Sequence, residues 1–214
     1  PQTFTVHPDP ALADILEGHF RPGFFTGVCT VVLKLFNAVF GTTGGGTAVF
    51  GKKDYQQRLV IERMVQQLAL PITIVGAEIA RAEGGLALSS RNGYLSAEQL
   101  EQARALSAAL HSLAQAARQG QQPLPVLEAQ TTHALNALGW QTDYLTVRLR
   151  DSLQPSLTHL SAATRRYAVL HAVPRVATTR PPFCTRFVPC VCPPLVSLCE
   201  CCPIALGRSH YDRF

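Results

Sequence analysis

The stretch GTAVFGKKDYQQ (residues 46–57) decides how the middle of the chain folds. It contains a short apolar run, TAVF, which is rich in strand-forming residues and stops at Gly51. After it, Tyr55, Leu59, Met64, Val65 and Leu68 recur at helical spacing. The sequence therefore predicts a strand-to-helix junction at Gly51 to Asp54.

The same stretch matches part of the P-loop frame G-x-x-x-x-G-K-[ST] through Gly46, Gly51 and Lys52. A P-loop wraps phosphate with the four positions between its glycines, and a hydroxyl after its lysine holds magnesium. Here those four positions form the predicted strand, and Lys53 replaces the hydroxyl residue. The match is interpreted as accidental.

The start of the predicted helix has two readings. Asp54 is a favoured N-cap residue and Gln57 lies three positions later, which is the spacing of a capping box. Capping does not explain Lys52 and Lys53, because cations oppose the positive end of a helix dipole. A bound anion would reverse that cost, so the junction is also a candidate phosphate site.

A second candidate site follows the strand-like run PITIVGAEI (residues 71–79). Ser89, Ser90 and Arg91 offer two hydroxyls beside a guanidinium, which suits a phosphate chain, although serine-rich turns before helices are common. Ser96 and Gln99 then predict a capping box for a long amphipathic helix.

Two earlier segments carry simpler predictions. Residues 28–36, VCTVVLKLF, have apolar side chains around most of a helical projection, which predicts a buried helix. Residues 41–45, GTTGG, predict a flexible turn.

Composition limits the class of protein. The 214 residues are 47% hydrophobic and 15% charged, which is enough for a globular core, and the net charge of +5 is spread along the chain. Because no basic stripe, long apolar stretch or signal peptide is visible, we expect no nucleic-acid or membrane partner and a cytoplasmic location. A small polyanionic substrate fits this charge.

The end of the chain differs from the rest. Six of the seven cysteines lie within residues 184–202, in a segment dense in proline that has no helical or strand period. The spacing differs from the paired C-x-x-C of structural zinc sites. Zinc, disulfides and an unstructured tail are the three alternatives, and the tail is favoured. Residues 181–214 are therefore expected to be a divergent tail, and no metal site is assigned.

FGKKDYQQ and GLALSSRNGYL, in this order, resemble the pantoate–β-alanine ligases, and so do the flanks LEGHFRPGFFTGVCTVVLKLFN, QTDYLTVR and RRYAVLHAV. The resemblance ends near Arg180. It implies an α/β fold: the remnant of a Rossmann-like nucleotidylyltransferase domain in residues 1–78, followed by a smaller α+β lid domain in residues 79–180. Because some strands of the family's sheet have no matching residues here, exposed apolar edges are expected. It also implies a homodimer.

The resemblance implies an ATP-dependent ligase that condenses pantoate with β-alanine through a pantoyl-adenylate, with ATP as its magnesium complex. Gln57 matches the family's pantoate-binding glutamine, and Lys53 is the residue favoured for phosphate contact. The positions matching the family's ATP-binding residues are Gly51, Lys52, Lys53, Asp54, Ala80, Leu88, Ser89, Ser90 and Arg91.

The sequence also departs from the family pattern. The His-x-Gly-His motif and the upstream FVNPxQF motif are missing from these residues, so no catalytic residue is assigned and the chain resembles the C-terminal part of the enzyme. Phe24 replaces a family His, and Lys52 replaces a Glu beside the expected phosphates. The alternative is a non-catalytic module that binds a nucleotide or anion, or that dimerises.

Overall fold

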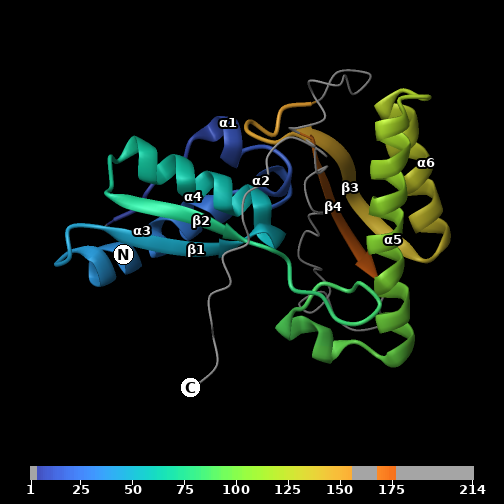
Figure 1. Cartoon of the computed structure of the whole chain (residues 1–214), viewed down its shortest axis with the longest axis horizontal. Helices are drawn as coiled ribbons and strands as arrows, with labels where there is room; N and C mark the ends of the chain where they lie inside the picture. Colours follow the sequence, from blue (N-terminus) through green and yellow to red (C-terminus); the bar gives the residue numbers. More distant parts are fainter. Residues whose placement is uncertain (1–3, 156–167, 177–214) are drawn as a thin grey trace, which may run out of the picture.

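A computed structural model describes residues 4–155 and 168–176 (Figure 1). The expected divergent tail, residues 181–214, and its six cysteines lie outside the described residues. The elements of the first half are α1 (Pro10–Ala13), α2 (Glu17–Phe20), α3 (Phe24–Phe40), β1 (Gly46–Gly51), the 3-10 turn η1 (Lys52–Asp54), α4 (Tyr55–Gln67) and β2 (Ile72–Ala77). The second half contains the 3-10 turn η2 (Ser90–Tyr94), α5 (Ala97–Gln119), α6 (Leu124–Ala137), β3 (Trp140–Leu149) and β4 (Ala168–Val176).

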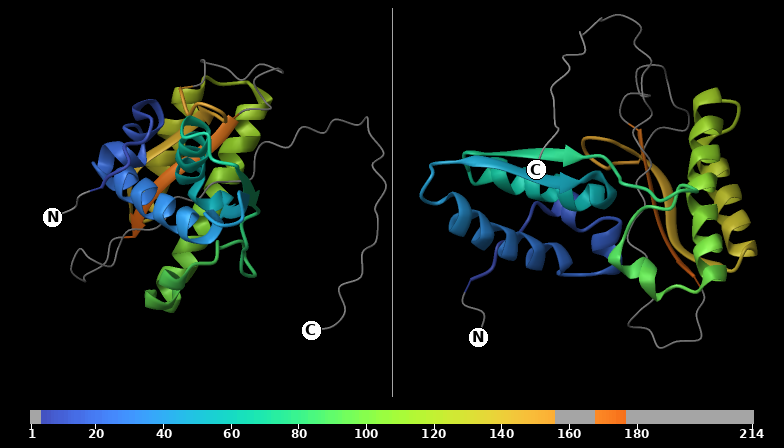
Figure 2. Two further views of the ribbon diagram at one scale, coloured as in Figure 1. Left: turned by 90° about the vertical axis from the view of Figure 1, so that its left-hand side faces the viewer. Right: turned by 60° about the horizontal axis from the view of Figure 1, so that its bottom comes forward.

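The first half is a β–α–β unit. β1 and β2 pair in parallel, with Gly46 opposite Ile72 and Gly51 opposite Ala77. Helix α4 connects them, and α3 and α4 lie on the same side of the sheet (Figure 2). The predicted strand, junction and helix are thus confirmed, as is the α/β fold class.

One face of the β1–β2 sheet builds the core and the other is open. Ala48, Phe50, Ile72 and Ile74 pack against a buried cluster that includes Phe25, Cys29, Val60, Ile61 and Met64. On the opposite face, Val49 is 64% exposed and Val75 is 41% exposed. Apolar surface is therefore exposed on the face of the sheet, whereas the expectation of exposed apolar edges stays a prediction.

Helix α3 is amphipathic, so the prediction of a wholly buried helix is wrong. Its inner positions, among them Cys29, Leu33 and Phe36, are buried, whereas Val31 and Leu35 are each 57% exposed. The physical reason is that α3 packs against α4 on one side only, and none of the described elements covers its outer side.

The turn from α3 to β1 is shaped by glycine and held by hydrogen bonds. Gly44 and Gly45 have φ angles of 72° and 143°, in the region that favours glycine. A Cβ on Gly45 would lie 2.3 Å from the carbonyl oxygen of Pro71. Thr43 Oγ1 donates to the carbonyls of Phe40 and Gly45, at 3.2 and 2.9 Å. Glycine at position 45 therefore allows the start of β1 to pass close to Pro71, which directly precedes β2.

The second half has its own buried cluster. β3 and β4 form an antiparallel pair, α6 packs against β3, and α5 lies beside α6 (Figure 1). Leu110, Leu113, Leu135 and Trp140 lie in this core. The division of the chain into domains at residue 78 stays a prediction. Among the described residues, no helix has the length and apolar character needed to cross a membrane.

Candidate functional site

The junction after β1 is built as the sequence predicts, except at the cap. Asp54 occupies the N-cap position of α4, but its side chain makes no capping hydrogen bond. Its φ and ψ of −94° and 61° belong to the end of the η1 turn, whereas a capping residue normally has an extended backbone. The predicted Asp54–Gln57 capping box is therefore wrong, because the chain enters α4 through a 3-10 turn.

The two lysines of the junction have different surroundings. Lys52 Nζ forms an ion pair with Glu78, which lies just after β2. The side chain of Lys52 is 21% exposed and passes over Gly76. Spacing alone did not identify Glu78, because 26 residues separate it from Lys52. The ion pair compensates the charge of Lys52 locally.

Lys53 links the junction to the loop after β2. Its Nζ donates a hydrogen bond to the carbonyl of Leu88 at 3.3 Å, across 35 positions of the sequence. The loop is folded back on itself, because the amide of Leu88 donates to the carbonyl of Ala80 at 2.8 Å. The two segments that carry the predicted ATP-binding residues therefore meet in space.

The Ser89–Arg91 segment enters the turn η2. Ser89 is half-buried and Ser90 is exposed. Asn92 fastens the turn, since its Nδ2 donates to the carbonyl of Ala87 at 3.0 Å and its amide donates to the carbonyl of Ser89 at 3.0 Å. The backbone of Arg91 lies in η2, but its side chain is outside the described part of the structure. Its convergence with Lys53 on one ligand stays a prediction.

The two glutamines of DYQQ have opposite roles in the structure. Gln56 is 2% exposed, and its Nε2 donates to the carbonyls of Leu12 and Ile15 at 2.8 Å each. Its Oε1 accepts from the amide of Glu17 at 3.1 Å. Gln57 is half-buried, and its amide has no partner among the described residues. Gln56 holds the fold together, whereas Gln57 is available to a ligand.

Cysteine and metal chemistry find no support in the described residues. Cys29 is fully buried, and burial raises the pKa of its thiol to about 11, so the reactive thiolate is suppressed at neutral pH. No group of three or more His, Cys, Asp or Glu side chains that could hold a metal ion occurs in residues 4–155 and 168–176. The zinc alternative concerned cysteines that lie outside these residues.

Comparison with known proteins identifies the family. The signature of the family "Pantoate-beta-alanine ligase" matches residues 1–180. The pantothenate synthetase of Verminephrobacter eiseniae is 60% identical over 180 residues, which are 84% of this chain and 63% of that protein.

Two solved structures are similar. The pantothenate synthetase of Thermus thermophilus superposes with a TM-score of 0.74 at 34% identity, over 91% of this chain and 65% of that one. A pantoate–β-alanine ligase of Francisella tularensis, complexed with beta-gamma ATP and β-alanine, shares the fold at 24% identity and a TM-score of 0.62, over 88% and 57% of the two chains. The chain thus spans somewhat less than two thirds of the length of these relatives. With the family signature on five sixths of its residues, the chain belongs to the pantoate–β-alanine ligase family.

Proposed function

We propose that this chain serves the ATP-dependent condensation of pantoate with β-alanine. The pantoate carboxylate attacks the α-phosphorus of ATP and pyrophosphate leaves, which gives a pantoyl-adenylate. The β-alanine amine then attacks the activated carbonyl carbon, AMP leaves with the bonding electrons of the broken C–O bond, and the amine loses its proton. The contact between Lys53 and Leu88 carries the proposal, because it brings together the two segments that match the family's ATP-binding residues.

Both steps develop negative charge on phosphate oxygens. Fixed cations stabilise such charge well where water is partly excluded. We assign Lys53 to the phosphates together with Arg91, Ser89 and Ser90, and the backbone around Ala80 and Leu88 to the nucleotide. Gly51 and Asp54 complete the site at the junction, where a small residue and a helix start let phosphate approach the backbone.

Lys52 has a separate role. Its ion pair with Glu78 joins the ends of β1 and β2, so we assign it to holding the two strand ends in register beside the nucleotide. Gln57 is assigned to pantoate, because its unpartnered amide offers both a donor and an acceptor for a carboxylate or hydroxyl group. Magnesium enters as the ATP complex and supplies charge neutralisation on the phosphates.

The reaction can be tested in two stages. ATP binding is measured by titration calorimetry, and pantoate-dependent release of pyrophosphate is measured with the Verminephrobacter relative as the reference. We expect ATP to bind, and pyrophosphate release to be lower than the reference by orders of magnitude, because the residues 1–214 contain no His-x-Gly-His motif. Absence of ATP binding would refute the proposal.

The homodimer and the cytoplasmic location also remain proposals. The exposed apolar side of α3, with Val31 and Leu35, is the surface that would support self-association. Equilibrium sedimentation checks the dimer, and a monomer at all concentrations would refute it. If ATP binds but pantoate has no effect on pyrophosphate release, the chain is a nucleotide-binding module instead.

A further inference from the structure

A polar pocket lies along the side of α4 that faces away from Gln57. Its volume is about 470 Å³, which is within the usual range for small-molecule sites. Tyr55, Leu59, Glu62 and Gln66, on successive turns of α4, form one wall. Leu12 closes one side, and the segment after β3 closes the other. Neither Lys53 nor the loop after β2 contributes to it.

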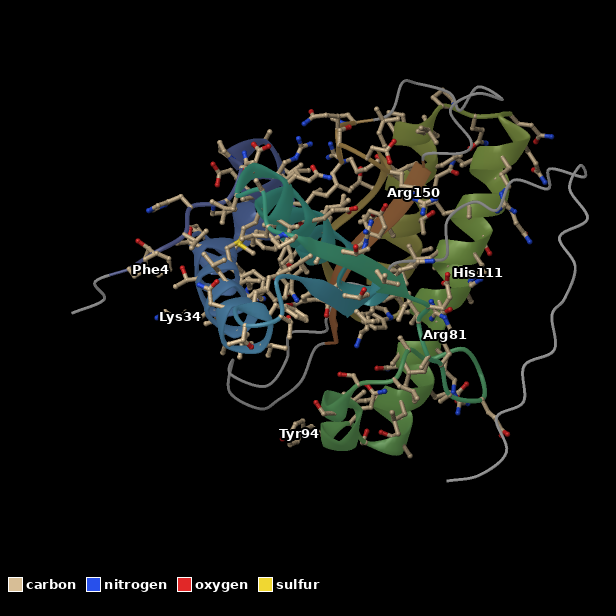
Figure 3. All side chains as sticks on the ribbon, turned by 60° about the vertical axis from the view of Figure 1, so that its left-hand side comes forward. Phe4, Lys34, Arg81, Tyr94, His111 and Arg150 are labelled. Atoms are coloured by element: carbon tan, nitrogen blue, oxygen red, sulfur yellow. The ribbon has the colours of Figure 1, made fainter. Side chains whose placement is uncertain are left out.

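The wall of the pocket begins at Tyr55, directly after the junction, but the loop after β2 lies apart from it. Figure 3 shows Arg150 well apart from Arg81 and Tyr94, which mark the loop after β2 and its 3-10 turn. A ligand of this pocket would therefore not contact the loop after β2.

Three guanidinium groups line this pocket, and they differ in how far they are neutralised. Arg58 is 12% exposed and pairs with Glu62 at 2.9 Å. Arg63 is 44% exposed and lies 3.7 Å from a carboxylate oxygen of Asp9. That carboxylate also accepts a hydrogen bond from the backbone of α1, at 3.0 Å to the amide of Ala11. Arg63 is thus only weakly paired.

The guanidinium of Arg150 is oriented by a hydrogen bond but forms no ion pair with a described residue. Its Nε donates to the hydroxyl of Tyr55 at 3.2 Å, and that hydroxyl donates back to the carbonyl of Arg150 at 3.2 Å. Tyr55 is 3% exposed, so it gives the guanidinium a fixed anchor. The terminal nitrogens of Arg150 have no partner among the described residues, and a guanidinium fork is suited to carboxylate or phosphate oxygens.

We propose that this pocket binds a small anion through a carboxylate or phosphate group, held by Arg150 and Arg63. Leu12 and Leu59 provide apolar surface for a carbon skeleton. Asp151 is the one lining carboxylate without a partner in the described structure, and it opposes an anion. None of the residues assigned to ATP lines this pocket, and the inference does not depend on the proposed function.

Titration calorimetry with inorganic phosphate and with succinate tests the site. We expect saturable binding of at least one probe, and the tighter of the two tells a phosphate site from a carboxylate site. Arg150→Gln and Arg63→Gln each should weaken binding about tenfold or more, because each removes charge-assisted hydrogen bonds. Asp151→Asn should tighten it, because it removes a repelling charge. Arg104→Gln, which changes an exposed arginine of α5 paired with Glu101, should have no effect.

Three outcomes would overturn the proposal. The first is the absence of saturable binding by either probe. The second is weaker binding in Asp151→Asn, which would mean that the pocket selects a positively charged or zwitterionic group. The third is loss of binding in Lys53→Gln, which would place the anion at the junction. Since Asp151→Asn and Arg150→Gln are expected to act in opposite directions, a general loss of folding cannot imitate the result.

Discussion

Helices α4 and α5 begin with the same sequence spacing and yet start in different ways. Asp54 and Gln57 stand at the start of α4 as Ser96 and Gln99 stand at the start of α5, and both pairs predict a capping box. At α5 the box forms: Ser96 Oγ accepts from the amide of Gln99 at 3.2 Å, and Gln99 Oε1 accepts from the amide of Ser96 at 3.0 Å. At α4 it does not. The helix with the self-contained cap follows the loop after β2, whereas the one without it starts at the junction that carries Lys53.

The largest expected effect is on stability, and it concerns Gln56, whose hydrogen bonds hold the start of α4. Gln56→Leu removes three hydrogen bonds and leaves the buried carbonyls of Leu12 and Ile15 and the amide of Glu17 without their partner. We expect the free energy of unfolding to fall by about 3 kcal/mol, measured by urea denaturation. Gln67→Leu, at an exposed position of the same helix, is the control. Equal loss in both variants would contradict this role.

The second prediction separates ligand binding from stability at the same helix start. Lys53→Gln should weaken ATP binding by about 2 kcal/mol, since it removes a charged donor from the phosphates. Its effect on unfolding should be small, because the contact of Lys53 with Leu88 is exposed. Lys34→Gln, on the exposed side of α3, has the same change of charge and should leave ATP affinity unaltered. Matching affinities of the two variants would refute the assignment.

The third prediction measures the cap that does form. Ser96→Ala should lower the free energy of unfolding by about 1 kcal/mol, because an alanine cannot accept the hydrogen bond from Gln99. Ser96→Asp should recover most of this loss, since aspartate caps equally well. ATP affinity should be the same in all three proteins. If alanine and aspartate destabilise equally, the box contributes nothing.

The smallest effect is expected at the position that a capping box would have required. Gln57→Ala should change the free energy of unfolding by less than about 0.5 kcal/mol, because the amide of Gln57 has no partner among the described residues. Pantoate binding, followed by calorimetry in the presence of ATP, should be weakened. A loss of stability as large as that of Ser96→Ala would show that α4 and α5 begin alike after all.

The sequence predicted what local chemistry determines. The apolar run of β1, the helical periodicity of α4 and the serine cap of α5 depend on residues within a few positions of one another, and all three are confirmed. The family motifs placed the candidate residues in two segments, and the hydrogen bond between Lys53 and Leu88 shows that these segments meet.

What the sequence could not predict depends on distant partners. Glu78 neutralises Lys52 across 26 positions, and no spacing rule connects them. The structural role of Gln56 depends on the carbonyls of Leu12 and Ile15, which lie more than 40 positions away in the sequence. The cap at Asp54 was predicted wrongly because the 3-10 turn η1 sets its backbone angles. The outer side of α3 was expected to be buried. A local apolar pattern does not show whether other elements pack on one side of a helix or on both.

The open face of the β1–β2 sheet has a practical consequence for solution behaviour. Parallel strands are ordinarily covered on both faces, and here Val49 and Val75 stand side by side in contact with water, since they are partners in the strand register. We expect this pair to make the melting temperature rise with protein concentration, as molecules shield these valines in one another. Val49→Thr keeps the β-branched shape and should remove the part of that dependence that comes from the sheet face, whereas a part that comes from the exposed side of α3 should remain.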